Sequence, residues 1–124
     1  MTNRSKIKAY NRGRFAERLA ALILRFKGFA ITERRYKTPV GEIDIIARKG
    51  DLTVFCEVKA RKDYVSAAES LSIKQKQRIA RAAEYYMARL KNNLNNNKIE
   101  NKTYRCDMIM IIPWRWPVHI ENAW

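Results

Sequence analysis

The chain has 124 residues, of which 47% are hydrophobic and 31% are charged, which suffices for one α/β core but not for two. Lysine and arginine number 26 against 12 aspartate and glutamate residues. The net charge of +14 favours a polyanionic partner such as nucleic acid, although a ribosomal-type or merely soluble basic surface explains it equally well. No apolar run approaches the roughly 20 residues that a membrane helix needs, so a transmembrane protein is excluded. We expect a single domain over residues 1–124.

The cysteines, the N-terminus and the histidine count narrow the class further. Cys56 and Cys106 each lie in an apolar, strand-like run, where free buried thiols are commoner than a bridge. The first residues lack the apolar stretch of a secretion signal. We therefore expect a cytoplasmic protein without membrane association. His119 is the only histidine, which excludes a histidine-rich zinc cluster and a histidine-dependent catalytic triad.

Basic residues dominate the N-terminal third of the chain. Residues 1–12 form a basic N-terminal extension, and in the rest of that third only Glu17 and Glu33 oppose the lysines and arginines. This third is therefore expected to face phosphate groups. Within it, apolar residues at helical spacing predict a helix from Arg14 to Phe26, which Gly28 would end as a C-cap.

Three strands are predicted after this helix. Phe29–Tyr36 is the first, and turn residues from Thr38 to Gly41 separate it from the next. Glu42–Arg48 and Leu52–Ala60 are rich in isoleucine, valine and phenylalanine. The short connection Lys49-Gly50-Asp51 between them predicts an antiparallel hairpin.

The second half of the chain predicts a helix, a loop, a strand and a tail. Ser72 and Gln75 have the spacing of a capping box, and the apolar spacing behind them predicts a helix to Leu90. Residues 91–103 form an asparagine-rich loop, Tyr104–Ile112 a buried strand, and residues 113–124 an irregular C-terminal tail. The predicted order is α-β-β-β-α-β, an α/β fold in which helices flank a mixed sheet of about four strands.

A carboxylate and an ammonium group are predicted to lie side by side in the hairpin. Side chains alternate along a strand, so Glu57 and Lys59 point to one face and Val58 to the other. A two-residue loop at either end of the connection brings Asp44 to the same face as Glu57. A three-residue loop without a bulge would instead pair Asp44 with Cys56.

Charged side chains in an otherwise apolar hairpin are costly to bury unless they are paired or bind an ion. Carboxylates and water are the usual ligands of Mg²⁺, which takes only one or two protein carboxylates. Phosphodiester hydrolysis would use such an ion to acidify a water molecule, while Lys59 orients the nucleophile or stabilises the oxyanion. The alternative is a buried ion pair of Asp44 or Glu57 with Lys59 that only fixes the strand register.

Four sequence runs together resemble a known family. They are Gly13-Arg14-Phe15-Ala16-Glu17-Arg18-Leu19-Ala20, Gly41-Glu42-Ile43-Asp44-Ile45-Ile46, Phe55-Cys56-Glu57-Val58-Lys59-Ala60-Arg61 and Arg105-Cys106-Asp107-Met108-Ile109. In this order and spacing they resemble the bacterial YraN family, which is related to the archaeal Holliday junction resolvases of the PD-(D/E)xK nuclease superfamily. The resemblance implies a restriction-endonuclease-like fold.

The resemblance also implies a set of catalytic residues. Asp44 and Glu57 would be the ligands of Mg²⁺ or Mn²⁺, Lys59 the catalytic lysine, and Glu17 an accessory carboxylate. Without the resemblance, Glu17 would be interpreted as a solvated helix residue. Asp107 matches the family pattern but is interpreted as structural, bonding neighbouring backbone.

Six residues are candidates for nucleic-acid contact. The second helix of the family carries a lysine near its start, which corresponds to Gln75 or to one of its two lysine neighbours, and Gln75 could equally serve only in the capping box. Arg61 leaves the strand that carries Glu57, although a solvated strand-end arginine is an alternative. The candidates are Arg12, Arg14, Arg61, Lys74, Gln75 and Lys76.

The sequence therefore predicts a metal-dependent endonuclease-like protein acting on structured or branched DNA. The main alternative is a nucleic-acid-binding module of the same fold with little or no cleavage, and a third is a basic assembly protein for RNA or ribosomes. A homodimer follows by analogy, because a four-way junction is two-fold symmetric. Trp114 and Trp116 should share a face, either closing the core or stacking on an unpaired base.

Overall fold

The computed structural model describes residues 3–93 and 102–124, with the backbone alone for residues 3–12. One mixed sheet has the strand order β1-β2-β3-β4-β5, in which β3 and β4 are parallel and the other neighbours antiparallel. The predicted α/β class with a mixed sheet is confirmed. The elements are α1 (Asn3–Phe26), β1 (Ala30–Thr38), β2 (Gly41–Lys49), β3 (Leu52–Ala60), α2 (Tyr64–Glu69), α3 (Ile73–Asn93), β4 (Thr103–Ile111) and β5 (Val118–Ile120).

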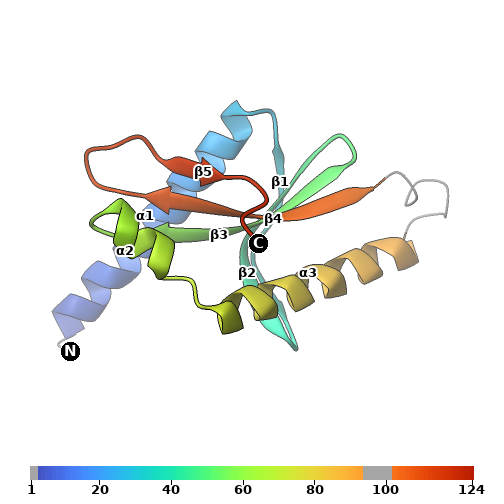
Figure 1. Ribbon diagram of the computed structural model, residues 1–124, viewed down its shortest axis with the longest axis horizontal. Helices are drawn as coiled ribbons and strands as arrows, with labels where there is room; N and C mark the ends of the chain where they lie inside the picture. The colour runs from blue at the N-terminus through green and yellow to red at the C-terminus, as the bar shows by residue number, and fades with distance from the viewer. Residues whose placement is uncertain (1–2, 94–101) are drawn as a thin grey trace.

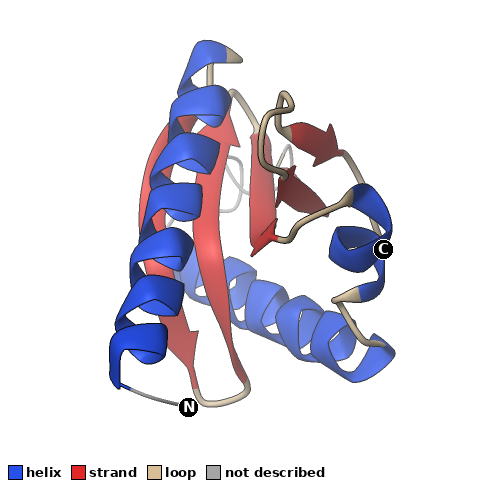
Figure 2. Ribbon diagram, turned by 90° about the vertical axis from the view of Figure 1, so that its left-hand side faces the viewer, coloured by secondary structure: helices blue, strands red, loops and turns tan. Residues whose placement is uncertain are grey.

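Helices cover both faces of the sheet. Figure 1 shows α3 lying across the sheet, and in Figure 2 α1 runs along one side of it while α2 and α3 lie on the other. This follows from strand alternation, which gives each central strand two apolar faces that must both be buried. None of the described helices has the length and apolar character needed to cross a membrane.

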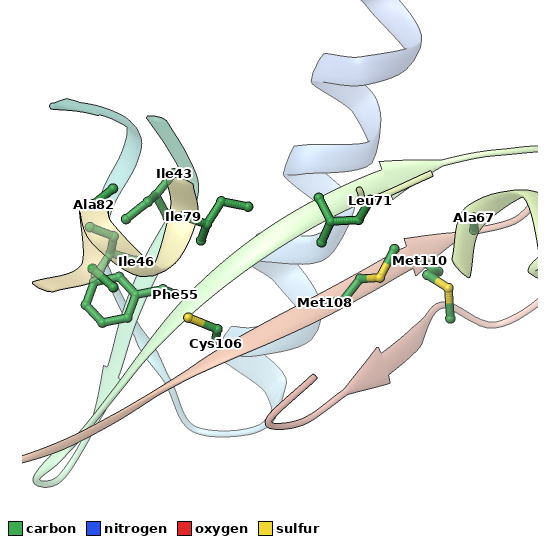
Figure 3. Packing of buried hydrophobic residues seen from close by; sticks show 11 residues of the cluster. Ile43, Ile46, Phe55, Ala67, Leu71, Ile79, Ala82, Cys106, Met108 and Met110 are labelled. Carbon is green, nitrogen blue, oxygen red and sulfur yellow. The ribbon is translucent and has the colours of Figure 1, made fainter. Parts of the chain in front are cut away.

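The two faces hold separate apolar clusters. Under α3, the side chains of β2, β3 and β4 pack against the helix, and Figure 3 shows Ile46 and Phe55 beside Ile79 and Ala82. Under α1, the opposite faces of the same strands pack against Ala20, Ala21 and Leu24. Cys56 and Cys106 belong to different clusters, and both are free and buried, as predicted. The central strands β2, β3 and β4 are therefore fixed from both sides.

The first helix is longer than predicted. It begins at Asn3 rather than at Arg14, so most of the segment described as a basic extension is helical. The added turns contain two lysines and two arginines, which are good helix formers, and no proline. No close contact requires glycine at position 13, because a Cβ there would meet no atom within 4 Å. The apolar spacing marked only the part of the helix that packs on the sheet.

The structure differs from three further predictions for the second half of the chain. The short helix α2 was not predicted; Asp63 caps it by accepting a hydrogen bond from the Ser66 amide at 2.8 Å. The helix predicted to end at Leu90 continues to Asn93, so the predicted loop 91–103 overlaps it, and residues 94–101 lie outside the described part. The tail 113–124 is not wholly irregular, because β5 pairs with β4 between Met108 and Met110.

Candidate active site

The hairpin register brings Asp44 beside Glu57. Lys49 pairs with Leu52, so the loop has the two residues Gly50 and Asp51, and the pairing continues to Ile45 opposite Cys56. This excludes the three-residue loop and places Asp44 next in register with Glu57. Beyond Ile45, the Asp44 carboxylate accepts a hydrogen bond from the Val58 amide at 2.9 Å. A side chain thus takes the place of a backbone acceptor where β2 and β3 separate.

Two carboxyl groups and one ammonium group meet at this point. Asp44 and Glu57 line the same two cavities. Lys59 Nζ lies 3.7 Å from Glu57 Oε1, and both side chains are largely buried. Burial, together with the neighbouring Asp44 charge, raises the pKa of Glu57 well above its usual range, and Lys59 only partly opposes this. Lys59 alone therefore does not supply enough positive charge to keep both carboxyl groups ionised.

The same groups line a cavity with a volume of about 710 Å³, called the main cavity below. Its walls come from α1, β2, β3, α2 and the segment between β3 and α2. Glu17, Asp44, Glu57 and Lys59, which the sequence singled out as a set, all lie on this one cavity. Its lining residues are Gly13, Ala16, Glu17, Asp44, Glu57, Val58, Lys59, Ala60, Arg61, Lys62 and Ser66.

Glu17 is not a solvated helix residue. Its side chain is 15% exposed and its Oε2 accepts a hydrogen bond from Arg35 Nε at 2.9 Å. Arg35 has a φ of 53°, in the left-handed region that residues other than glycine seldom adopt. Sequence reasoning missed this partner, because neither strand alternation nor spacing predicts a left-handed arginine within β1. Glu17 therefore reaches the cavity already paired.

A second cavity of about 300 Å³ opens on the α3 side of the two carboxyl groups. Asp44 and Glu57 line it together with Gln75 and Arg78 of α3. The Gln75 side-chain Oε1 accepts a hydrogen bond from the Ser72 backbone N–H at 3.0 Å. The Gln75 backbone N–H donates to Ser72 Oγ at 3.1 Å, which confirms the capping box. Gly41 permits this packing, since a Cβ there would lie 2.9 Å from the Arg78 carbonyl oxygen.

Arg78 was also missed by the sequence analysis. Its position three residues after Gln75, on the same helix face, was the signal that could have found it. The lysines beside Gln75 differ in exposure, Lys74 being exposed and Lys76 half-buried. The other candidates for nucleic-acid contact are spread around the main cavity.

Arg61 is exposed and lines the main cavity. Arg14 lines a neighbouring cavity of about 320 Å³ that shares Glu17 as a wall. The Arg12 side chain lies outside the described part of the structure. Arg18, Arg34 and Arg35 also line the cavity beside Arg14, and the sequence analysis had not assigned them a contact.

The donor atoms at the site fit a hard divalent ion. Asp44 and Glu57 supply two adjacent carboxylates whose negative charge Lys59 offsets only in part. Mg²⁺ needs no more than one or two protein carboxylates, because water and substrate phosphate complete its shell. Among the described residues, no three histidine, cysteine, aspartate or glutamate side chains are grouped for metal binding, so Glu17 stands apart from the pair.

The model of the uncharacterised protein family UPF0102 matches residues 16–111. A UPF0102 protein of Mesorhizobium japonicum is 45% identical over 119 residues, covering 96% of this chain and 90% of that protein. A UPF0102 protein of Bartonella tribocorum is 48% identical over 113 residues, covering 91% and 82%.

Among solved structures, Hjc of Archaeoglobus fulgidus, described as a Holliday junction resolvase from an archaeal hyperthermophile, has a similar fold. The TM-score is 0.56 at 19% identity, and the match covers 84% of this chain and 74% of Hjc. This likeness confirms the resolvase-type fold that the sequence runs implied. The matches to the family model and to its members, at 41–48% identity for the first five, show that the chain belongs to the uncharacterised protein family UPF0102, the YraN family.

Proposed function

We propose that this protein is a divalent-metal-dependent endonuclease that hydrolyses phosphodiester bonds in structured or branched DNA, in the cytoplasm and as a homodimer. The observation that supports the proposal most is the gathering of Asp44, Glu57, Lys59 and Glu17 on one cavity of a resolvase-type fold. A pair of largely buried carboxyl groups in a cavity, with one pKa strongly raised, is frequent in functional sites. The net charge of +14 suits a polyanionic substrate.

Asp44 and Glu57 are the residues that would hold the ion. Bound Mg²⁺ or Mn²⁺ would acidify a water molecule and neutralise charge on the scissile phosphate. The Val58 amide fixes the Asp44 carboxylate at 2.9 Å, so that this side chain is oriented before any ligand binds. Orientation of this kind lowers the cost of assembling the site when substrate arrives.

Lys59 is placed to act on the reacting phosphate. Its ammonium group lies at the cavity wall, and Glu57 at 3.7 Å restrains it without a close ion pair. A cation held in this way can orient the attacking water or stabilise charge that develops on a phosphate oxygen. Glu17, held by Arg35, would support the site from α1.

The basic residues around the cavities would hold the rest of the nucleic acid. Arg61 stands at the rim of the main cavity, and Gln75 at the cavity on the α3 side. Contacts to backbone phosphates position a substrate without reading its sequence. The proposed set is Arg12, Arg14, Arg61, Lys74, Gln75 and Lys76.

A binding module with little or no cleavage is the second candidate. One observation favours it: Glu17 pairs with Arg35 and does not join the two carboxyl groups. In that case Lys59 would serve only as counter-ion to the carboxyl pair.

Cleavage assays on four-way junction, flap, duplex and single-stranded DNA, with and without Mg²⁺, test the proposal. We expect Mg²⁺-dependent cleavage of the branched substrates and binding that weakens steeply with salt, because several phosphates would be contacted. Binding without cleavage under every metal condition would contradict the nuclease and leave the binding module. Sedimentation of the protein with a four-way junction tests the homodimer.

A further inference from the structure

An apolar groove of about 300 Å³ adjoins the main cavity. Phe15 of α1 forms one of its walls, although this side chain is 63% exposed. Ala16, Ala60, Arg61 and Lys62 line both the groove and the main cavity, so the two are continuous. The groove is lined by Phe15, Ala16, Ala60, Arg61, Lys62, Ile111 and Pro113.

The groove lies where two parallel strands end together. Ala60 at the end of β3 pairs with Ile111 at the end of β4. Figure 1 shows both strands ending on the side of the molecule where α2 and the connection between β4 and β5 lie. That connection carries the two tryptophans that the sequence analysis left undecided between core and surface.

Both tryptophans face solvent. Trp114 is 103% exposed and Trp116 is 90% exposed, so the alternative that they close the core is wrong. Trp114 follows Pro113 of the groove wall and has a φ of 63°, which is costly for a side chain of this size. An exposed indole on a left-handed residue gains no packing within the chain that offsets this cost.

Positive charge lies in the groove lining and between the two tryptophans in the sequence. Arg61 and Lys62 are exposed at the rim shared with the main cavity, and Arg115 is exposed between the two tryptophans. The nearby Asp63 is already engaged in capping α2. The surface therefore combines aromatic rings with cations, which is the composition that binds single-stranded nucleic acid.

We propose that this groove binds an unpaired nucleobase adjacent to the phosphate held in the main cavity, with Trp114 offering a stacking surface for a neighbouring base. The inference rests on the proposed function and narrows its substrate to DNA with unpaired or unstacked bases beside the cleaved bond. A strand whose phosphate occupies the main cavity brings its next nucleotide to the shared walls. The flat face of a base is accessible there only when the base has left its stack.

Charge argues against a second copy of the chain as the occupant. A symmetric interface would place the same patch on both sides, so Arg61, Lys62 and Arg115 would face their own equivalents. A nucleotide has an aromatic base that fits the apolar lining and a negative phosphate that fits the cationic rim. The groove and its rim are complementary to that combination.

Equilibrium binding in EDTA tests the inference separately from cleavage. The probes are a blunt DNA duplex and the same duplex with a single-stranded extension that carries 2-aminopurine, whose fluorescence is quenched on stacking. The variants are Phe15→Ala and Trp114→Asn, since asparagine tolerates the left-handed backbone. Phe26→Ala is the matched control, because Phe26 is an exposed aromatic residue of the same helix, outside the groove lining.

We expect each variant to lower affinity for the extended duplex by about tenfold and to weaken the quenching, while affinity for the blunt duplex stays within about twofold. Phe26→Ala should change neither. Equal losses on both probes, no loss on either, or loss of a dimer without a change in preference would overturn the inference. Cleavage by the wild type in Mg²⁺ is measured separately. A wild type that cleaves DNA but does not prefer the extended duplex would refute only the proposed base-binding groove. A wild type that prefers the extended duplex but does not cleave would refute only the proposed nuclease activity.

Discussion

Two acidic groups on the same sheet are treated in opposite ways. Asp107 on β4 is fully buried and accepts three hydrogen bonds, from Arg105 Nε at 2.9 Å, His119 Nε2 at 2.7 Å and the Asn122 amide at 3.0 Å. Lys27 Nζ extends the network by donating to His119 Nδ1 at 2.8 Å. These bonds tie the segment after β4 back to the sheet, as the structural interpretation of Asp107 predicted.

Glu57 on β3 has far less support. Its ion-pair partner is Lys59 at 3.7 Å, and the charge of Asp44 acts against its ionisation. Burial by itself raises the pKa of both acids, but at Asp107 the hydrogen bonds outweigh burial and lower the pKa, whereas at Glu57 the Asp44 charge adds to burial. Asp107 therefore stabilises the fold, whereas the pair Asp44 and Glu57 lowers its stability, as groups in functional sites often do.

The largest effect on stability is expected from removing the satisfied acid. Asp107→Ala leaves Arg105 and His119 without their buried acceptor and should lower the free energy of unfolding by about 3–5 kcal/mol. Urea denaturation followed by circular dichroism measures this. Asp44→Ala is the matched change at the other region, and an equal loss there would erase the contrast between the two.

The largest effect on activity is expected from Lys59→Ala. Turnover of branched DNA should fall by at least about 10²–10³-fold, because the ammonium group acts on the attacking water or the developing charge, while binding stays nearly unchanged. Single-turnover cleavage and anisotropy measure the two quantities. Lys102→Ala is the control, since Lys102 also pairs with an acid, Asp51, at 3.4 Å beyond the opposite end of β3. Cleavage that survives in a folded Lys59→Ala protein would show that the site is wrongly placed.

A smaller and opposite effect is expected from Glu57→Gln. The folded state raises the pKa of Glu57, so at neutral pH this acid must take up a proton on folding, and glutamine removes that cost. The free energy of unfolding of the metal-free protein should therefore rise by about 1–2 kcal/mol at neutral pH. The same change should remove most of the thermal stabilisation that Mn²⁺ gives the wild type. Thermal melts with EDTA and with Mn²⁺ test both, and a destabilised Glu57→Gln protein would mean that Lys59 satisfies Glu57 after all.

The smallest effect concerns acid pH. Because the folded state lowers the pKa of Asp107, the stability gained from its ionised form is complete above the ordinary aspartate pKa of about 3.9 and is lost as pH falls through the lower folded value. Asp107→Asn should therefore flatten the stability curve below about pH 4 relative to the wild type. Parallel curves for the two proteins between pH 5 and pH 2, about the range over which aspartates titrate, would contradict this.

Patterns local to one strand pair or helix face could be predicted from the sequence. Parity and a two-residue loop were enough to bring Asp44 to Glu57, and the capping box at Ser72 has the predicted bonds. The strand Leu52–Ala60 has the predicted bounds because turn residues end it cleanly on one side.

Features that depend on tertiary contact could not be predicted. The pairing of Glu17 with Arg35 needs both the packing of α1 on the sheet and a left-handed residue in β1. β5 has only three residues, too few for a recognisable strand pattern in the sequence. Its His119 is bonded to Asp107 of β4, a contact that the sequence does not show. Helix α2, with six residues, is too short for apolar spacing to reveal.

The proposed activity depends on Asp44 and Glu57 holding a divalent ion together. Anomalous diffraction from crystals soaked in Mn²⁺ tests it most directly, since the ion's position is located without reference to activity. We expect an anomalous peak within coordination distance of the carboxylates of Asp44 and Glu57, and its loss in Glu57→Gln crystals. A peak elsewhere, or none at a Mn²⁺ concentration that supports cleavage, would contradict it.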